Sequence, residues 1–438
     1  MRHTWFRMSF VIAMITLLLL TACGGNSTPT TTTTSNDPSV LDANKHYTVD
    51  FWEAFGVGAN KTALESLTAQ YMQSHANVKV NLTPYDSYPT LQTKLNAAIA
   101  AHKTPAIAQV YETWASQYQQ SGQIVSLQPY ISGKNGLSAQ DLSDFYPSLL
   151  ADGKINGEQY MLPFNKSDEV VYYNADVLQS MNIAPPTTLQ DFVTDLTKVT
   201  QSGSRWGLSL TPSVDEWSIL YKSLGGKNFV AQDGKSVAFN QDPDKNAAKQ
   251  ALDTLAPLVK SGAIHVTSGY AWQNDFLSQK SVFAISTIAS YPFLAKGGFK
   301  FSEAPIPAGP AGQYTVLFGT NLALFKGVDN DTRAAAWDFM KYLTGTSANT
   351  AFVKGTGYMP VRQSTFNSPD LQSYYTQIPA RKVGPQMLNN AFVASILPAW
   401  QTCRDEISAG FTSVLKGQAT SDDALTKMAQ RCNDDLSK

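Results

Sequence analysis

Side chains that could carry enzyme chemistry occur in this chain, but their spacing matches no catalytic motif. The five histidines are not paired at the separations that bind zinc. Neither the G-x-S-x-G turn of hydrolases nor the G-x-x-x-x-G-K-[ST] phosphate loop occurs. Asp168 and Glu169 are adjacent carboxylates, but neighbouring residues of a strand point to opposite faces. We therefore expect no catalytic residue, no metal and no other cofactor.

The composition narrows the possible partners and the compartment. Lys and Arg number 33 and Asp and Glu 34, so the net charge is −1 and the basic surface that nucleic-acid binding needs is missing. Only 15% of the residues are charged, against about 25% in an average protein, so uncharged polar side chains must cover much of the surface. This composition suits a protein outside the cytoplasm, and we expect no nucleic-acid partner.

The first 25 residues indicate export and attachment to a membrane. Arg2 and Arg7 precede an apolar run at residues 10–20, which is shorter than the about 20 residues of a membrane-spanning helix and matches the core of a signal peptide. Small residues then lead to Cys23, and this pattern resembles a bacterial lipobox, in which the cysteine is lipidated. We predict a signal peptide at residues 1–22 and a protein anchored through lipid to the extracytoplasmic face of the cell membrane. The alternative is a buried N-terminal helix.

The segment after Cys23 predicts a flexible tether. Residues 26–42 are rich in Thr, Ser and Pro and nearly lack apolar side chains, so they cannot form a core. We place the lipidated cysteine and the tether together at residues 23–45. Such a tether lets a folded body sample the space above a membrane.

The body of the chain alternates strand and helix patterns in two stretches. A length of 438 residues predicts two or three domains. The first stretch begins at Tyr47 with a β-α-β-α-β order, and the second begins at Glu169, so we expect an α/β fold. The expected strands are 47–52, 78–82, 106–111, 169–174, 206–210 and 282–288, and the expected helices are 61–75, 91–101, 188–199, 247–261, 332–343, 398–416 and 421–436.

Two further cysteines are candidates for a disulfide. Cys403 and Cys432 lie at almost equal distances on either side of Gly417, between two predicted helices. In an antiparallel helical hairpin they would face each other, and an oxidising compartment would permit a disulfide. The alternative is a pair of free buried thiols.

Eight short motifs follow one another along the body. They are VDFW (49–52), AIAQVYE (106–112), NGEQY (156–160), LPFN (162–165), VYYN (171–174), PPTT (185–188), FLSQK (276–280) and GTGYMPVR (355–362). Their order and spacing together resemble the family 1 extracellular solute-binding proteins of ABC importers, over about residues 47–436. The resemblance implies a two-lobed fold of the periplasmic-binding-protein type, with hinge crossovers and a ligand cleft between the lobes.

Within that family the motifs are most similar to the branch that binds glycerol-3-phosphate. Position by position, the resemblance implies ligand contacts from Tyr88, Glu112, Ser167, Thr287, Gly319 and Tyr358. The phosphate-binding arginine of that branch matches Arg404 when counted back from Gly417, but Gln401 when counted forward from Pro398. The ligand therefore stays open between a sugar and glycerol-3-phosphate or a glycerophosphodiester.

The chemistry of these residues fits a polyhydroxylated ligand. The hydroxyl groups and Glu112 would hydrogen-bond the OH groups of a polyol, and an arginine is what a phosphate requires. Three tryptophans are candidates to offer flat apolar faces to a sugar ring, namely Trp52, Trp217 and Trp400. The structural alternatives are core positions for the aromatics, a helix cap for Glu112, a turn for Gly319 and a solvated charge for Arg404.

The resemblance also implies a mechanism and partners. The two lobes would comprise residues 46–166 with 320–395 and residues 167–319 with 396–438. A ligand bound to both lobes would stabilise a closed form, and that form, a monomer, would dock on the permease subunits of an ABC transporter. The alternatives are a secreted carbohydrate-processing enzyme, whose two carboxylates can lie far apart in sequence, and a sensor lipoprotein.

Overall fold

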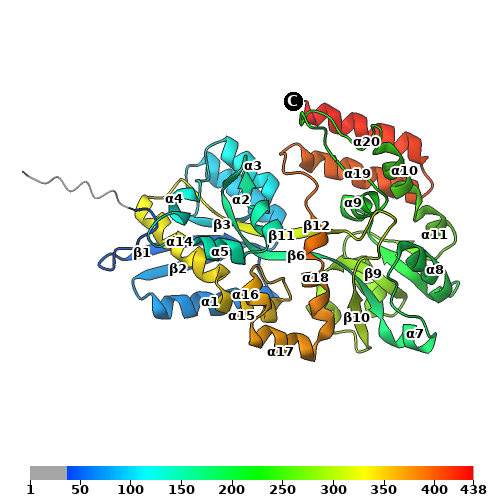
Figure 1. Ribbon diagram of the computed structural model, residues 1–438, viewed down its shortest axis with the longest axis horizontal. Coiled ribbons are helices and arrows are strands. Elements are labelled where there is room, and N and C mark those ends of the chain that lie inside the picture. Colours follow the sequence, from blue (N-terminus) through cyan, green and yellow to red (C-terminus); the bar gives the residue numbers. More distant parts are fainter. Residues whose placement is uncertain (1–36, 438) are drawn as a thin grey trace, which may run out of the picture. The chain divides into compact units, whose positions relative to one another are not determined.

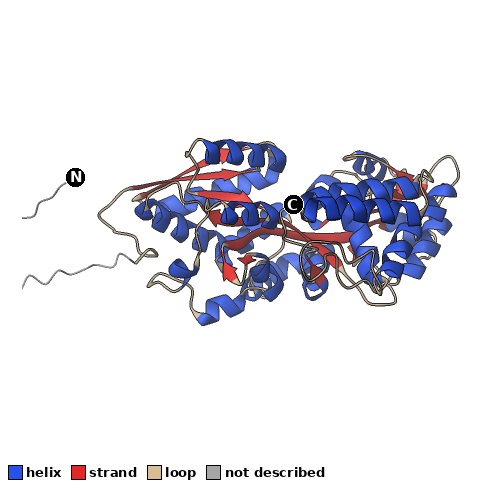
Figure 2. Cartoon of the chain, turned by 90° about the horizontal axis from the view of Figure 1, so that it is seen from above, coloured by secondary structure: helices blue, strands red, loops and turns tan. Residues whose placement is uncertain are grey.

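The computed structural model describes residues 37–437 (Figure 1). The predicted signal peptide, the predicted lipidation site Cys23 and the first part of the predicted tether lie outside the described residues. Within residues 37–437, no helix is long and apolar enough to cross a membrane. Strands and helices alternate along the described chain, and Figure 2 shows the helices flanking the strands.

The secondary structure has the following bounds. The strands are β1 Tyr47–Glu53, β2 Val78–Pro84, β3 Ile107–Val110, β4 Lys154–Ile155, β5 Glu158–Gln159, β6 Met161–Asn174, β7 Trp206–Leu210, β8 Ile264–Val266, β9 Ser281–Thr287, β10 Phe301–Ala304, β11 Thr315–Leu324 and β12 Ala391–Phe392. The α-helices are α1 Gly58–Ser74, α2 Tyr88–Ala100, α3 Glu112–Gln120, α4 Gln128–Ile131, α5 Ala139–Asp144, α6 Pro147–Asp152, α7 Ala175–Ser180, α8 Leu189–Val199, α9 Val214–Ser223, α10 Lys245–Asp253, α11 Ala256–Lys260, α12 Ala271–Leu277, α13 Tyr291–Leu294, α14 Asn330–Thr344, α15 Thr346–Thr356, α16 Gln363–Phe366, α17 Pro369–Gln377, α18 Val383–Gln386, α19 Trp400–Leu415 and α20 Ser421–Leu436.

One ten-stranded sheet connects the two lobes. Its strand order is β2-β1-β3-β11-β6-β9-β7-β8, with β10 paired to β6 and β12 paired to β11. In lobe 1, β1 is parallel to β2 and β3, and in lobe 2, β7 is parallel to β8 and β9. The long strands β6 and β11 run antiparallel between these two parallel groups (Figure 1). They are therefore the segments that cross from one lobe to the other.

The crossing of β6 and β11 requires a glycine. Gly319 lies opposite Lys166 and has a φ of +85°, which side chains with a Cβ rarely adopt. A Cβ at this position would lie 1.8 Å from the carbonyl oxygen of Asn165. The backbone itself therefore accounts for Gly319 at the crossover.

Each lobe has its own hydrophobic core. In lobe 1, Val49 and Phe51 of β1 pack with Phe339 of α14. In lobe 2, Leu208 of β7 and Phe283 of β9 belong to a larger cluster that also includes residues of α8, α9, α10, α19 and α20. A third cluster joins the two lobes, since Phe145 and Val361 pack with Val170 and Tyr172 of β6.

Two predicted elements differ from the structure. The strand expected at residues 169–174 is only the second half of β6, which begins at Met161. β6 is buried on both faces along nearly its whole length, so it lacks the alternation of polar and apolar residues that marks a half-exposed strand. The helix expected at residues 247–261 is divided into α10 and α11, because Pro257 lacks the N–H that a continuous helix needs.

Candidate ligand-binding site

A cavity of about 380 Å³ is lined by residues of both lobes. One side, here named the lobe 1 wall, consists of Tyr88, Gln92, Tyr111, Glu112 and Trp114. The other side, named the lobe 2 wall, consists of Asp215, Gln401 and Arg404. The crossing strand β11 contributes Phe318 to the lining. A solute in this cavity can therefore contact both lobes at once.

The ends of two parallel strands place the lobe 1 wall. The chain leaving β2 enters α2 at Tyr88, after the helix cap Ser87, and the chain leaving β3 enters α3 at Glu112. The carboxyl ends of parallel strands meet at one edge of a sheet, so these helix starts lie together. The ring of Tyr111 meets the rings of Tyr88 and Trp114 edge to face, with centroids 5.2 and 5.1 Å apart. The wall thus offers a continuous aromatic surface.

Buried amide side chains hold the hydroxyl group of Tyr88. Asn165 Nδ2 donates a hydrogen bond to the Tyr88 hydroxyl oxygen at 2.8 Å. Asn165 Oδ1 accepts hydrogen bonds from Gln109 Nε2 at 3.1 Å and from the Thr320 hydroxyl at 2.5 Å. Gln109 Oε1 in turn accepts from the Ala54 N–H at 2.7 Å. This network joins β3, β6 and β11 to the residue after β1, so the sheet itself orients Tyr88.

The pKa of Glu112 allows this side chain to be either protonated or ionised near neutral pH. Burial, with a smaller contribution from the negative charge of Asp152, raises the pKa of Glu112 to about 7. Lys166 opposes this rise, but its ammonium group is already paired with Asp152 at 2.6 Å, and both side chains are buried. As a neutral acid Glu112 donates a hydrogen bond, and as a carboxylate it only accepts. Both forms suit a solute hydroxyl group.

The first turns of two helices supply the lobe 2 wall. Asp215 lies in the first turn of α9, and the Ser213 hydroxyl oxygen accepts a hydrogen bond from its N–H at 3.0 Å. Arg404 Nη2, on α19, donates to Asp215 Oδ2 at 2.7 Å. Ser408 ties the two helices together, because its hydroxyl donates to the Arg404 carbonyl at 2.7 Å and accepts from the Val214 N–H at 2.9 Å. The wall is therefore a charged pair on two linked helices.

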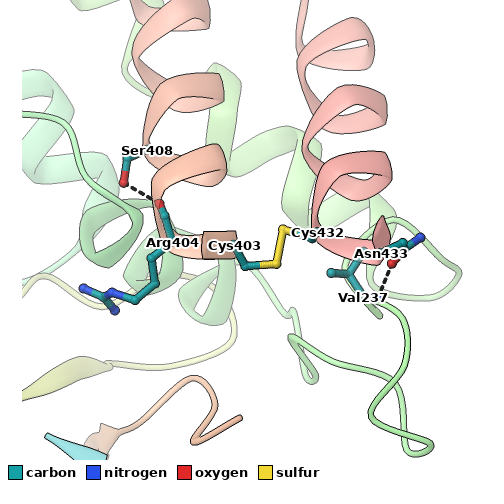
Figure 3. The surroundings of a disulfide bond; sticks show 6 residues. All are labelled: Val237, Cys403, Arg404, Ser408, Cys432 and Asn433. Carbon is teal, nitrogen blue, oxygen red and sulfur yellow. Dashed lines mark hydrogen bonds between the residues drawn. A yellow bond between two sulfur atoms is a disulfide. The ribbon is translucent and has the colours of Figure 1, made fainter. Parts of the chain in front are cut away.

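A disulfide anchors the helix that carries Arg404. Cys403 of α19 and Cys432 of α20 form a disulfide with their Cα atoms 4.8 Å apart, and both are fully buried (Figure 3). Figure 3 shows the Arg404 side chain leaving α19 on the side away from the sulfur atoms. The disulfide expected from the cysteine spacing is thus present in the structure. It fixes the turn of α19 from which Arg404 extends.

Part of the predicted ligand contacts come together at the cavity. Tyr88, Glu112 and Arg404 line it, and so does Gln401, the alternative to Arg404. Tyr358 is buried, and its hydroxyl group interacts with that of Tyr88. Both alternatives for the phosphate-binding position are therefore available to a ligand.

Three predicted contacts lie in or next to the crossing strands instead. Ser167 is buried in β6, Gly319 lies in β11, and Thr287 ends β9 beside β6. None of the three is among the described residues that line the cavity. The Thr287 backbone carbonyl accepts a hydrogen bond from the Tyr172 hydroxyl at 2.8 Å, so this position is tied to β6.

The structure does not bring the predicted tryptophan faces to the cavity. Trp217 is fully buried in the lobe 2 core and stacks on Tyr221 at 5.2 Å, and Trp400 is 1% exposed and meets Phe229 at 5.8 Å. Trp52 is half-buried and is also absent from the described lining residues. The helical period explains Trp217, which lies two residues from Asp215 and so on the opposite side of α9. It does not explain Trp400, which begins α19 one turn before Arg404 and packs into the lobe 2 core.

Sequence reasoning missed eight of the described lining residues, among them Tyr111, Trp114 and Asp215. Tyr111 and Trp114 flank Glu112, and the end of a predicted strand at Glu112 was a signal that could have pointed to them. Asp215 gave a misleading signal, because it lies inside a capping box formed by Ser213 and Glu216. An acidic residue in such a box is normally explained by the helix alone.

A two-lobed α/β fold with crossing strands and a cavity lined from both lobes defines a binding protein of the periplasmic type. The GacH receptor of Streptomyces glaucescens has this fold, with 20% identity, a TM-score of 0.77 and coverage of 90% of this chain and 99% of that chain. The sugar-binding protein MalE of Xanthomonas citri superposes with a TM-score of 0.77 at 17% identity, covering 89% and 97%. UgpB of Mycobacterium tuberculosis, solved with glycerophosphocholine, has a TM-score of 0.74 at 20% identity, covering 89% and 98%. The predicted fold class is confirmed.

Residues 66–380 match the family of bacterial extracellular solute-binding proteins, and the chain belongs to this family. The sn-glycerol-3-phosphate-binding periplasmic protein UgpB of Rhizobium meliloti is 25% identical over 412 residues, which cover 88% of this chain and 93% of the relative. The protein of the same name from Yersinia enterocolitica is 24% identical over 368 residues, covering 78% and 80%. The family resemblance inferred from the sequence is confirmed.

Proposed function

We propose that this chain is the substrate-binding protein of an ABC importer, which captures a small polyhydroxylated solute and delivers it to a membrane permease. The observation that carries the proposal is the cavity, in which the lobe 1 wall and the lobe 2 wall present hydroxyl, amide, carboxyl and guanidinium groups to one space. A ligand that contacts both walls stabilises the conformation in which both are within reach. Capture is thereby coupled to a change of shape that a permease can recognise.

The proteins similar to this chain support the ligand class. The relatives bind sn-glycerol-3-phosphate, and structures with the same fold were solved with acarbose and with glycerophosphocholine. All of these ligands carry hydroxyl groups on adjacent carbon atoms. We propose a sugar or a glycerol-phosphate-like polyol for this chain, and we propose that the protein leaves its ligand chemically unchanged.

We further propose that the mature protein is a lipid-anchored monomer outside the cytoplasm. The pattern of a signal peptide at residues 1–22, the lipobox at Cys23 and the Thr-rich segment that follows support this arrangement. The tether was predicted to reach residue 45, but Ser39 is buried and Asp37 accepts a hydrogen bond from the Lys134 N–H at 2.7 Å, so residues 37–45 belong to the folded body. Each acyl CH₂ group that enters the membrane contributes about 0.8 kcal/mol to anchoring. The lobes proposed are residues 46–166 with 320–395 and residues 167–319 with 396–438.

The anchor is tested by fractionation and fatty-acid labelling of cells that express the full chain. We expect Cys23→Ala to abolish labelling and to remove the protein from the membrane fraction. Ser27→Ala, a change within the tether, serves as the matched control and keeps the label. Labelling that survives Cys23→Ala contradicts the proposed anchor.

The binding function is tested with the purified mature chain by titration calorimetry and small-angle X-ray scattering. We expect heat of association with at least one sugar or glycerol phosphate, and a smaller radius of gyration when that solute is bound. Tyr88→Ala should weaken binding at least about tenfold, whereas Thr426→Ala, an exposed change on α20, should not. Unchanged scattering and no heat with every solute contradict the proposal, and release of product from an oligosaccharide favours the enzyme alternative.

A further inference from the structure

The charged groups of the cavity are unequal in number. Among the described lining residues, the acidic side chains are Glu112 and Asp215, and Arg404 is the basic one. Lys166 lies nearby but is buried, with its ammonium group donating to Asp152 at 2.6 Å and to the Gly319 carbonyl at 3.1 Å. One guanidinium therefore faces two carboxyl groups, and no second cation of the described lining adds to it.

The charge of the Arg404 guanidinium is already partly balanced by Asp215. The guanidinium donates to Asp215 Oδ2 at 2.7 Å, and the Asp215 side chain is only 9% exposed while that of Arg404 is 30% exposed. Asp215 is held by its own helix, because Ser213 caps α9 at this turn and a helix N-terminus favours a negative charge. The Asp215 carboxylate cannot leave without breaking a partly buried ion pair, which leaves a charge unpaired.

This pairing disfavours a phosphate monoester. Such a group carries about −1.5 to −2 charges at neutral pH and is normally held by cationic groups that are free to form several hydrogen bonds. In this cavity it would share its one cation with Asp215, and Glu112 would repel it whenever Glu112 is ionised. Like charges placed side by side in a partly buried site oppose binding strongly.

The same groups suit an uncharged polyol. A sugar hydroxyl can donate to the Asp215 carboxylate and accept from the Arg404 guanidinium at the same time, because both donors and acceptors face the cavity. The edge-to-face rings of Tyr88, Tyr111 and Trp114 offer apolar surface to the C–H groups of a sugar ring. Neither interaction needs a net positive charge.

We propose that Asp215 sets the ligand class of this cavity: paired with Arg404, it makes the site accept an uncharged saccharide and reject phosphate monoesters. This inference rests on the proposed function and narrows it. It rests on one ion pair, whose partners are 189 residues apart in sequence.

The test compares wild type, Asp215→Asn and Asp191→Asn by thermal-shift screening followed by calorimetry. Asp191 is the matched control, because it also lies in the first turn of a helix but hydrogen-bonds Thr188 outside the cavity. The probes are neutral mono-, di- and trisaccharides, glycerol-3-phosphate and glycerophosphocholine. We expect wild type to bind a saccharide at least about 100-fold more tightly than glycerol-3-phosphate.

Asp215→Asn should reverse part of this preference. Removing one negative charge frees Arg404, so affinity for glycerol-3-phosphate should rise at least about tenfold while saccharide affinity falls. Asp191→Asn should change neither. If Asp215→Asn does not fold, Arg404→Gln gives a second measurement, and we expect it to weaken saccharide binding about tenfold.

Distinct results overturn the inference and the proposed function. If wild type prefers glycerol-3-phosphate or glycerophosphocholine, or if Asp215→Asn leaves phosphate affinity unchanged, the assignment to Asp215 is wrong while the binding function stands. The same holds if Arg404→Gln weakens phosphate binding alone. If no probe binds wild type or either variant, the proposed function fails, and the inference fails with it.

Discussion

The lobe 1 wall and the lobe 2 wall of the cavity are supported by different parts of the fold. Tyr88 is oriented by the neutral amide network of Asn165 and Gln109, which is built into the shared sheet. Asp215 and Arg404 instead stand on two helices that Ser408 links to each other. The first wall is supported by a buried network within the sheet, and the second by hydrogen bonds and a disulfide between helices.

The difference suggests a division of roles. A side chain fixed by several buried hydrogen bonds loses little freedom when a ligand arrives, so the lobe 1 wall is suited to initial capture. A helix-borne ion pair can exchange part of its bonding with a ligand hydroxyl, so the lobe 2 wall is suited to discriminate by charge. Four variants test the crossing strands and the supports of the two walls.

The largest expected effect comes from the crossing strands. Gly319→Ala should lower the free energy of unfolding by about 4 kcal/mol, because the new Cβ would meet the Asn165 carbonyl and the residue would keep a positive φ. Urea unfolding measures the loss. Gly417→Ala, at a φ of +67° with no atom within 4 Å, is the matched control and should cost about 1 kcal/mol. Equal losses would show that steric contact at the crossing is unimportant.

The second-largest expected effect concerns the disulfide that supports the lobe 2 wall. Replacing Cys403 and Cys432 together with Ala should lower the free energy of unfolding by about 3 kcal/mol, because the disulfide closes a loop with a sequence separation of 29. Calorimetric melting of wild type with and without reductant should show a similar loss, and reductant should not affect the double variant. A double variant as stable as oxidised wild type would mean that packing alone holds α19.

The third effect concerns Glu112 in the lobe 1 wall and depends on pH. The folded state holds the Glu112 proton up to about pH 7, whereas the ordinary pKa of a glutamate in an unfolded chain is 4.5, so folding takes up a proton between these values. The free energy of unfolding therefore falls as pH rises through this window. Glu112→Gln removes the contribution, and the variant should gain up to about 2 kcal/mol over wild type between about pH 4.5 and pH 7.

The measurement for Glu112 is the difference between two pH–stability profiles obtained by chemical unfolding. Gln92→Ala changes a neutral residue of the same wall and should shift the profile without changing its slope. A difference between Glu112→Gln and wild type that stays constant from pH 4.5 to pH 7 would mean that burial does not favour the neutral acid.

The smallest expected effect tests the amide network. Asn165→Ala should lower the free energy of unfolding by about 1.5 kcal/mol, because Gln109 and Thr320 lose a buried partner, and it should weaken ligand binding as Tyr88 loses its orientation. Thermal unfolding and calorimetry measure both. Asn81→Ala, whose side chain bonds Asp50 at the surface, is the control and should cost less than about 0.5 kcal/mol. Unchanged ligand affinity in Asn165→Ala would contradict the proposed support of Tyr88.

Much of the fold follows from local pattern, and the exceptions have identifiable causes. The helix expected after Thr188 begins there, because Thr188 accepts a hydrogen bond from the Asp191 N–H at 3.1 Å. The first half of β6 was not predicted, since a strand buried on both faces lacks alternation and includes Lys166 and Asp168. A buried lysine gives no strand signal unless its partner, here Asp152, is known.

The site was predicted where a residue follows the end of a strand or matches a family motif, as Tyr88 and Glu112 do. It was not predicted where helix orientation decides between core and cavity. Trp217 and Asp215 are two residues apart on α9, yet one is buried in the core and the other lines the cavity. Which face of a helix is buried depends on the elements that pack against that helix, so the sequence of the helix alone does not decide it.

The α/β architecture, the family and the expected pairing of Cys403 with Cys432 could be predicted before the structure, because they depend on periodicity, motif order and spacing along the chain. The contacts of Asp215 with Arg404 and of Asn165 with Tyr88 could not be predicted in this way. These contacts join residues from distant segments, and their energies depend on burial and on a geometry of a few ångströms. The burial of these residues and the distances between them are defined only after the two lobes and the crossing strands have folded.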